Sequence, residues 1–200
     1  MFVAFEGIDG SGKSTQARML YEHMSRKEKV VVTQEPTDGE VGQLLRRCLK
    51  GEVRVSDRTI QLLFVADRSE HVKGILLETS KGISVISDRY VLSTIAYGMA
   101  AGLDKKWLIE LNKEFPVPDH TVIINVDAKE AMGRIEERMS EKGREKAGKV
   151  RAELFEKMEF LEKVGKAYTD IVDLYPNTHM INSEDGVEET FDRVLAAIKE

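Results

Sequence analysis

A glycine-rich segment near the N-terminus has the residue types and spacing that hold a chain of phosphates. Residues 7–14 fit the pattern G-x-x-x-x-G-K-[ST] and read Gly7, Ile8, Asp9, Gly10, Ser11, Gly12, Lys13 and Ser14. Glycines let backbone N–H groups curl around phosphate oxygens, and the helix that follows presents its N-terminus to the same anion. The Lys13 ammonium can reach the terminal phosphates, and the Ser14 hydroxyl can bind Mg²⁺. We therefore predict a nucleotide-binding P-loop, in which Thr15 continues the helix and touches the α-phosphate.

A carboxylate and a guanidinium stand next to each other where a short apolar run ends. Asp88 and Arg89 follow the run at residues 83–87, which has the length and composition of a buried strand. Ligands of parallel sheets bind at the carboxyl ends of the strands, so this pair should face the same site as the P-loop. Asp88 can hold Mg²⁺ there, and Arg89 can bridge two phosphate groups and offset their repulsion. The two motifs together predict transfer of a phosphoryl group from a nucleotide to a second anion.

The elements that carry these residues alternate between short strand-like runs and longer helical ones. Strands are expected at residues 2–6, 30–34, 83–87, 120–126 and 178–182. Helices are expected at residues 13–26, 41–50, 56–80, 92–101, 105–114, 128–141, 151–174 and 186–199, the third with Ser56 as its N-cap. This alternation predicts an α/β fold, a five-stranded parallel sheet with helices on both faces. No linker divides the chain, so residues 1–200 are expected to form a single P-loop domain.

Composition and charge argue against several other classes of protein. The 200 residues are 42% hydrophobic and 32% charged, which are values of a globular chain. The net charge of −5 argues against a general nucleic-acid binder, because such proteins carry a basic excess. There is no stretch of about 18 apolar residues and no basic start of a signal peptide, so neither membrane insertion nor secretion is expected. The single cysteine, Cys48, fits a small core residue better than a reactive thiol, and an unpaired cysteine suits the reducing cytoplasm.

The stretch that begins with the Asp88–Arg89 pair resembles one family of kinases. Residues 88–97 closely match D-R-[YHF]-x-x-S-[TN]-x-A-[YF], a signature of thymidylate kinases. Three further pieces resemble the same family in the same order: the P-loop with its acidic residue, the T-x-E-P stretch at residues 33–36, and Phe64-x-x-x-Arg68. The resemblance covers nearly the whole chain. It implies the fold of nucleoside monophosphate kinases and a homodimeric, Mg²⁺-dependent enzyme that phosphorylates dTMP with ATP.

The resemblance also assigns contacts with the acceptor nucleotide to residues of this sequence. It implies that Phe64 stacks on thymine, that Arg68 donates to O4 of the base, and that Thr94 contacts the N3 edge. Tyr97 would lie below the sugar, where a 2′-hydroxyl would clash, and would thereby favour deoxyribose. Taken alone, Phe64 in its apolar run is more typical of a core residue. The order of the motifs is what favours stacking.

The same resemblance implies ligand contacts for three further polar side chains. Asp9 would bind the 3′-hydroxyl of the acceptor and hold it in line for attack. Arg46 would touch the acceptor phosphate, although a solvated helix charge fits this position nearly as well. Arg134 would stack on the adenine of ATP, and an ordinary surface position on a helix is the alternative.

A local basic cluster departs from the acidic balance of the chain. Residues 138–151 hold only Glu141 and Glu145 against the basic side chains Arg138, Lys142, Arg144, Lys146, Lys149 and Arg151. The resemblance places the lid of the family here. Family members with a glycine-type P-loop supply a transition-state arginine from this lid. Arg144 and Arg151 are both candidates, and the sequence does not decide between them.

Two positions depart from the family pattern, and two rival functions stay open. Gln34 stands where T-R-E-P has arginine, and Gly98 stands where many members have Gln or Ser after A-Y. Gly98 leaves some polar contacts near the acceptor undefined. The first rival is a kinase of the same fold acting on dUMP, CMP, AMP or a nucleoside; deoxynucleoside kinases typically have Glu-Arg-Ser where this chain has Asp-Arg-Tyr. The second is a non-catalytic ATP-binding module, which would need no acceptor arginine such as Arg89.

Overall fold

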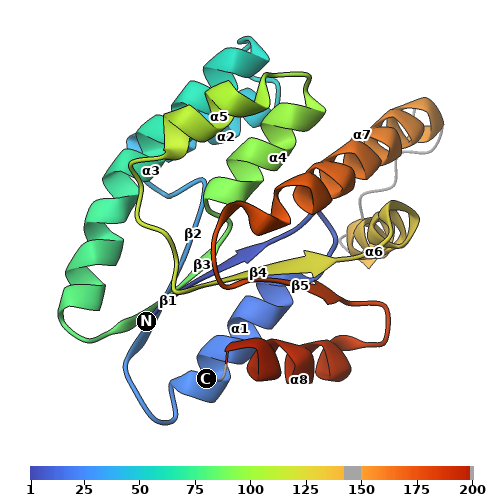
Figure 1. Ribbon diagram of the computed structural model, residues 1–200. Coiled ribbons are helices and arrows are strands. Elements are labelled where there is room, and N and C mark those ends of the chain that lie inside the picture. The colour runs from blue at the N-terminus through green and yellow to red at the C-terminus, as the bar shows by residue number, and fades with distance from the viewer. Residues whose placement is uncertain (142–149, 199–200) are drawn as a thin grey trace.

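A sheet of five parallel strands in the order β2-β3-β1-β4-β5 forms the centre of the molecule (Figure 1). The computed structural model describes residues 1–141 and 150–198, with side chains described outside 139–141 and 150–155. The strands are β1 (Phe2–Glu6), β2 (Val30–Gln34), β3 (Ser84–Asp88), β4 (His120–Asn125) and β5 (Thr178–Asn182). The predicted five-stranded parallel sheet is confirmed.

Helices cover both faces of this sheet (Figure 1). The helices are α1 (Lys13–Met24), α2 (Glu40–Leu49), α3 (Asp57–Ser80), α4 (Val91–Ala100), α5 (Lys105–Asn112), α6 (Ala128–Glu141), α7 (Val150–Ile171), the 3₁₀ helix η1 (Val172–Leu174) and α8 (Val187–Ile198). One face carries α1 and α8, and the other carries α3, α4 and α7. This two-sided cover requires a sheet that is apolar on both faces.

The central strand β1 supplies side chains to two separate cores. Phe2 and Ala4 join the core beneath α3, α4 and α7, whereas Val3 and Phe5 join the core beneath α1 and α8. All five residues of β1 are buried. An almost continuous apolar run is what a parallel strand covered on both faces needs. The polar residue that ends this run, Glu6, therefore lies inside the protein, next to the P-loop.

Several element boundaries differ from the sequence expectation by one to three residues, including those of β3 and α7. Strand β3 includes Asp88, one residue further than predicted, because this residue pairs with Phe5 of β1 and Gln34 of β2. The helix expected to continue to residue 174 ends with α7, and η1 forms its last turn. The predicted N-cap is confirmed: the Ser56 hydroxyl accepts a hydrogen bond from the Thr59 N–H at 3.2 Å.

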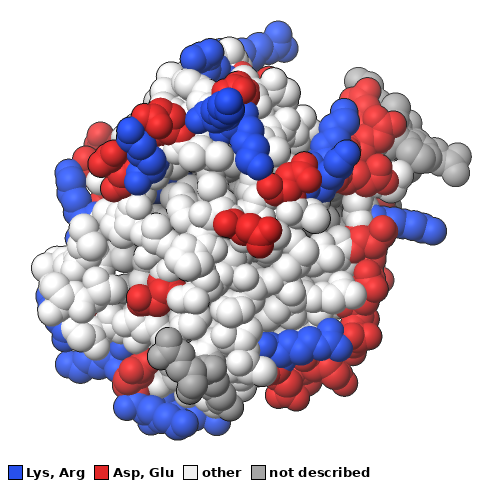
Figure 2. All heavy atoms as spheres, viewed as in Figure 1, with Lys and Arg blue, Asp and Glu red and all other residues white. Residues whose placement is uncertain are grey.

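Charged side chains of both signs are scattered over the face shown in Figure 2, and Asp and Glu dominate the right edge of the view. They do not form one continuous basic field among the residues described on that face. Within the described part of the chain, no helix combines the length and the apolar character needed to cross a bilayer.

Candidate active site

The P-loop connects β1 to α1 at the carboxyl edge of the sheet. Its glycines adopt left-handed backbone conformations, with φ 138° at Gly7 and 83° at Gly10. A Cβ atom at Gly7 would stand 2.5 Å from the carbonyl oxygen of Ile124, and one at Gly10 would collide with that of Ala131. Both positions therefore need glycine, for conformation and for space. The loop has the strand-to-helix context that the sequence motif predicted.

The Lys13 ammonium lies buried over the P-loop. Its Nζ donates to the carbonyl oxygen of Ile8 at 3.3 Å and forms a long ion pair with Asp9 Oδ1 at 3.9 Å. Burial, followed by the positive charge of Arg89, lowers the pKa of Lys13 to about 8, because the nearby carboxylates only partly offset these two effects. A desolvated cation at the mouth of a loop of N–H groups favours an anionic ligand.

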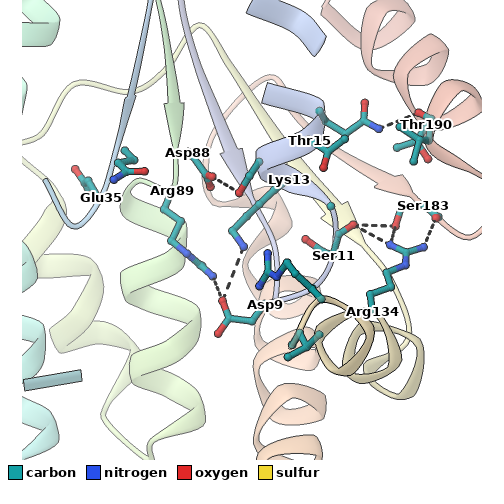
Figure 3. Close-up of a pocket in the computed structure, with 18 of the residues that line it drawn as sticks. Asp9, Ser11, Lys13, Thr15, Glu35, Asp88, Arg89, Arg134, Ser183 and Thr190 are labelled. Carbon is teal, nitrogen blue, oxygen red and sulfur yellow. Dashed lines mark hydrogen bonds and ion pairs between the residues drawn. The ribbon is translucent and has the colours of Figure 1, made fainter. Parts of the chain in front are cut away.

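The hydroxyl of Ser14 and the carboxylate of Asp88 meet beside the P-loop (Figure 3). Ser14 Oγ donates to Asp88 Oδ2, whereas Asp88 Oδ1 is buried and has no hydrogen-bond partner among the described residues. Two hard oxygen donors, one of them an orphaned carboxylate oxygen, fit the ligand preference of Mg²⁺. The predicted metal-binding pair is thus brought together at the edge of the phosphate site.

The Arg89 guanidinium is held by four hydrogen-bond partners. Arg89 has a left-handed backbone conformation, with φ 75°, which is uncommon for a residue with a side chain. Its guanidinium donates to the carbonyl oxygen of Gly7 at 3.2 Å, to Ser93 Oγ at 2.9 Å, to Tyr97 Oη at 3.1 Å and to Asp9 Oδ1. Burial opposes its charge, but the surrounding tyrosines and carboxylates outweigh burial and raise the pKa of Arg89. The guanidinium is thus fixed in one place and permanently charged.

Two cations, Arg89 and Lys13, converge on one oxygen of Asp9 (Figure 3). Arg89 and Lys13 both reach its Oδ1, and the charge of Lys157 on α7 acts on it as well. Burial would raise the pKa of Asp9, but these positive charges together lower it. Asp9 is therefore a carboxylate at neutral pH and can accept hydrogen bonds from a ligand.

Two cavities open on either side of this ionic cluster. The P-loop cavity, about 580 Å³, is lined by residues 9–16, Asp88, Arg89 and parts of α6 and α8. The Phe64 cavity, about 700 Å³, is lined by residues of α3 and α4 that include Phe64 and Tyr97. Asp9, Pro36 and Arg89 line both cavities. The shared wall allows two ligands to approach the same guanidinium.

Arg68 and Thr94 form a hydrogen bond with each other, and neither side chain lines the Phe64 cavity. The Arg68 guanidinium is fully buried and forms a bidentate ion pair with Glu35, with Nε 3.0 Å and 3.2 Å from the two carboxylate oxygens. Its Nη2 also donates to Thr94 Oγ1 at 2.7 Å and to the carbonyl oxygen of Tyr90 at 3.0 Å, and its Nη1 donates to Asn112. The predicted base contacts of Arg68 and Thr94 stay predictions.

Arg46 and Arg134 line the P-loop cavity from two sides. Arg46 donates to Asp38 Oδ1 at 2.7 Å and to the carbonyl oxygen of Pro36 at 2.6 Å, so it also fixes the loop after β2. Arg134 donates to the carbonyl oxygens of Ser11 at 3.2 Å and of Ser183 at 2.8 Å, which ties α6 to the P-loop (Figure 3). Both predicted positions therefore lie at the site and have structural contacts as well.

The predicted lid falls largely outside the description. Arg144 lies outside the described residues, and Arg151 belongs to α7 but its side chain is not among those described. Arg138, at the last turn of α6, lines the P-loop cavity. The choice between the two lid arginines stays a prediction.

Sequence analysis assigned no role to the buried side chains that lie next to Arg89. Glu6 is fully buried and accepts from the Tyr90 N–H at 3.0 Å, from Ser93 Oγ and from Tyr168 Oη at 3.2 Å. Burial raises the pKa of Glu6. The signal was an acid at the end of the otherwise apolar strand β1, directly before the P-loop.

Comparison with known proteins places these features in one family. A family model described as thymidylate kinase matches residues 5–194. The probable thymidylate kinase of Pyrococcus horikoshii is 38% identical over 99% of this chain and 95% of its own length, and that of Methanocaldococcus jannaschii is 34% identical over 100% and 96%. The crystal structure of thymidylate kinase from Ehrlichia chaffeensis superposes with a TM-score of 0.76 at 30% identity and covers 100% of this chain and 98% of its own. The chain belongs to the thymidylate kinase family.

Proposed function

We propose that this chain transfers the γ-phosphoryl group of ATP directly to dTMP, which produces dTDP for dTTP biosynthesis. The observation that carries the proposal is the wall shared by two cavities, in which Asp9 and Arg89 face both. ATP in the P-loop cavity brings its γ-phosphate to this wall from one side. The phosphate of dTMP in the Phe64 cavity approaches it from the other.

The proposed reaction is a single in-line displacement. The acceptor is already an anion, so neither a strong general base nor a covalent enzyme intermediate is needed. Catalysis then rests on positioning and on neutralisation of charge. Lys13 binds the β- and γ-phosphates, the N–H groups of residues 7–15 cradle the triphosphate, and Arg89 holds the acceptor phosphate beside the transferring group.

Ser14 and Asp88 would hold Mg²⁺, which would neutralise phosphate charge when bound. The orphaned Asp88 Oδ1 supports this assignment. On the acceptor side, Asp9 accepts a hydrogen bond from the 3′-hydroxyl, Phe64 stacks on the base and Tyr97 packs below the sugar. Arg46 reaches the acceptor phosphate and Arg134 the adenine.

The proposal also covers the domain organisation, the oligomeric state and the cellular location of the enzyme. All steps take place within a single domain, residues 1–200, whose lid at residues 138–151 supplies Arg144 or Arg151 to the transition state and excludes water. The enzyme acts as a homodimer. It is placed in the cytoplasm, where the one buried thiol, Cys48, stays reduced.

The experiment that tests the proposal offers five acceptors in parallel. ADP release from Mg-ATP is measured with dTMP, dUMP, dCMP, dAMP and thymidine. Turnover that is fastest with dTMP supports the proposal. Preference for another acceptor would overturn the assignment of the base cavity and keep the phosphate chemistry. Nucleotide binding without turnover on any acceptor would identify a non-catalytic module.

The affinity for ATP is expected to fall as the pH rises above about 8. The pKa of Lys13 is about 8 in the free protein, and a bound phosphate favours the charged form, so binding above this pH requires uptake of a proton. The dissociation constant should therefore rise by up to about tenfold per pH unit above this value. Calorimetric titration with ATP at pH 8.5, in two buffers of different ionisation enthalpy, measures the proton uptake directly. Constant affinity from pH 7 to 9.5 without proton uptake would contradict this assignment.

Truncation of Tyr97 is expected to weaken the preference for deoxyribose. The Tyr97 ring forms part of the wall of the Phe64 cavity and packs edge-on against Phe160 at 6.0 Å. Tyr97→Ala removes this wall, so the ratio of kcat/KM for dTMP over its ribose counterpart should fall roughly tenfold or more. Tyr97→Phe is the matched control: it keeps the ring, loses only the hydroxyl contact to Arg89, and should keep the ratio. An unchanged ratio in Tyr97→Ala would remove the sugar role.

A further inference from the structure

One buried carboxylate is linked to both ends of Arg89. Glu6 ends strand β1 and is fully buried. Its Oε1 accepts a hydrogen bond at 3.0 Å from the backbone N–H of Tyr90, the residue directly after Arg89. Its Oε2 accepts a hydrogen bond from Ser93 Oγ, and the same hydroxyl accepts one from Arg89 Nη1 at 2.9 Å. One side chain therefore contacts the backbone next to Arg89 and the hydroxyl that holds its guanidinium.

The backbone of Arg89 needs this support because its conformation is unfavourable. A φ of 75° puts a residue with a side chain in the left-handed region, which glycine occupies far more easily. Two consecutive residues of β1 hold the turn: the Arg89 N–H donates to the carbonyl oxygen of Phe5 at 2.8 Å, and the Tyr90 N–H donates to Glu6. Loss of the second contact leaves a buried N–H group without its acceptor, which favours relaxation of the turn.

Ser93 connects the same carboxylate to the guanidinium. Its hydroxyl has one hydrogen, which goes to Glu6 Oε2, so its lone pairs are directed toward Arg89 Nη1. Tyr168 Oη, on α7, lies 2.9 Å from this hydroxyl and donates to Glu6 Oε2 at 3.2 Å. Hydrogen bonds in such a buried chain polarise one another and restrict the side chains that form them. The position of the guanidinium is therefore set by the groups behind it as well as by Asp9.

We propose that Glu6 is a positioning residue of the kinase reaction, which holds both the backbone turn and the guanidinium of Arg89 in place. The inference rests on the proposed function, in which Arg89 lies between the two phosphates. Glu6 is fully buried and lines neither the P-loop cavity nor the Phe64 cavity. Its effect on the reaction therefore passes through Arg89, and a small displacement of this guanidinium is enough to slow phosphoryl transfer.

The first test is Glu6→Gln, which keeps the shape of the side chain and replaces one acceptor oxygen by a donor NH₂ group. The two ends of an amide do not both accept hydrogen bonds, so either the turn or the guanidinium of Arg89 loses its support. We expect kcat for dTMP to fall roughly 10- to 100-fold. The dissociation constant for ATP and the KM for dTMP should change by less than about threefold. ADP release and calorimetric titration with ATP measure these quantities.

A double-mutant cycle separates positioning of Arg89 from a general structural role. In the Arg89→Ala background, Glu6→Gln should leave kcat unchanged within about twofold, because no guanidinium remains to be positioned. A residue that supports only the fold would lower kcat by the same factor in both backgrounds. Equal losses in the two backgrounds would therefore overturn the proposal, and so would a wild-type kcat for Glu6→Gln alone.

Ser93→Ala tests the proposal independently, should Glu6→Gln fail to fold. It keeps Glu6 and removes only the hydroxyl that links the carboxylate to the guanidinium. We expect kcat to fall roughly 10-fold with Arg89 present and to stay unchanged in the Arg89→Ala background. The same loss with and without Arg89, or no loss at all, would contradict the proposal.

Ser84→Ala is the matched control for the serine variant. Ser84 is also buried and lies at the other end of β3 from Asp88, where its hydroxyl donates to Glu28 at 3.0 Å. This variant should keep the wild-type kcat. Failure of the proposed function is recognised separately, because the wild-type enzyme itself would then not phosphorylate dTMP.

Discussion

Replacing Arg89 by alanine is expected to lower kcat for dTMP phosphorylation by roughly 10³-fold or more, the scale of an arginine that stabilises a transferring phosphoryl group. The guanidinium faces both cavities and is held by Gly7, Ser93 and Tyr97. A group fixed in this way needs no reorganisation during the reaction, and its loss leaves two phosphate anions to repel each other. The rate is measured by ADP release at saturating ATP and dTMP.

The dissociation constant for ATP distinguishes the loss of this catalytic role from a general loss of structure at the site. Among the described residues, the Arg89 side chain donates one hydrogen bond to the P-loop backbone, at Gly7, so the dissociation constant for ATP should change far less than kcat. Arg89→Lys is the matched control: it keeps a charge but loses the fork of donors, and an intermediate loss is expected. Turnover of Arg89→Ala near the wild-type rate would remove this residue from the mechanism.

Replacing Arg68 by methionine is expected to destabilise the protein by about 3–5 kcal/mol, the usual cost of breaking a buried ion pair. Both partners are almost fully buried, with Arg68 0% and Glu35 1% side-chain exposure, so the substitution leaves the Glu35 carboxylate inside the protein with His71 Nδ1, at 2.9 Å, as its remaining side-chain partner among the described residues. A loss of this size should lower the melting temperature by roughly 6–20 °C for a chain of this length. Urea and thermal unfolding measure it.

The same helix offers a matched control for this prediction. Lys73 pairs with Glu70 on α3, and both are exposed, at 71% and 66% of the side chain. Lys73→Met should therefore cost less than about 1 kcal/mol. The double variant Glu35→Met with Arg68→Met removes both buried charges and should recover much of the lost stability. A cost below about 1 kcal/mol for Arg68→Met would show that the buried pair contributes little.

The sheet and the P-loop were predictable because their signals are local. The apolar runs give the strands, and the spacing of glycines, Lys13 and Ser14 gives the cradle between β1 and α1. The pair Asp88 and Arg89 was placed correctly because parallel strands bring their carboxyl ends to one edge. These patterns need no knowledge of which distant residues come into contact.

The buried hydrogen-bond partners of Arg68 could not be predicted from local signals in this way. Its place on the Phe64 face of α3 follows from helical spacing, but its partners Glu35 and Asn112 lie 33 and 44 residues away in sequence. A guanidinium on an amphipathic helix fits a ligand contact and a buried ion pair equally well.

In the proposed arrangement, with ATP in the P-loop cavity and dTMP in the Phe64 cavity, the shared wall links the binding of the two substrates thermodynamically. An anion bound on one side of Arg89 changes the charge that an anion on the other side meets, so neither affinity is a property of one cavity alone. By reciprocity, the factor by which bound ATP changes the affinity for dTMP equals the factor by which bound dTMP changes the affinity for ATP. An inhibitor that occupies one cavity therefore has a potency set partly by the cellular concentration of the other substrate.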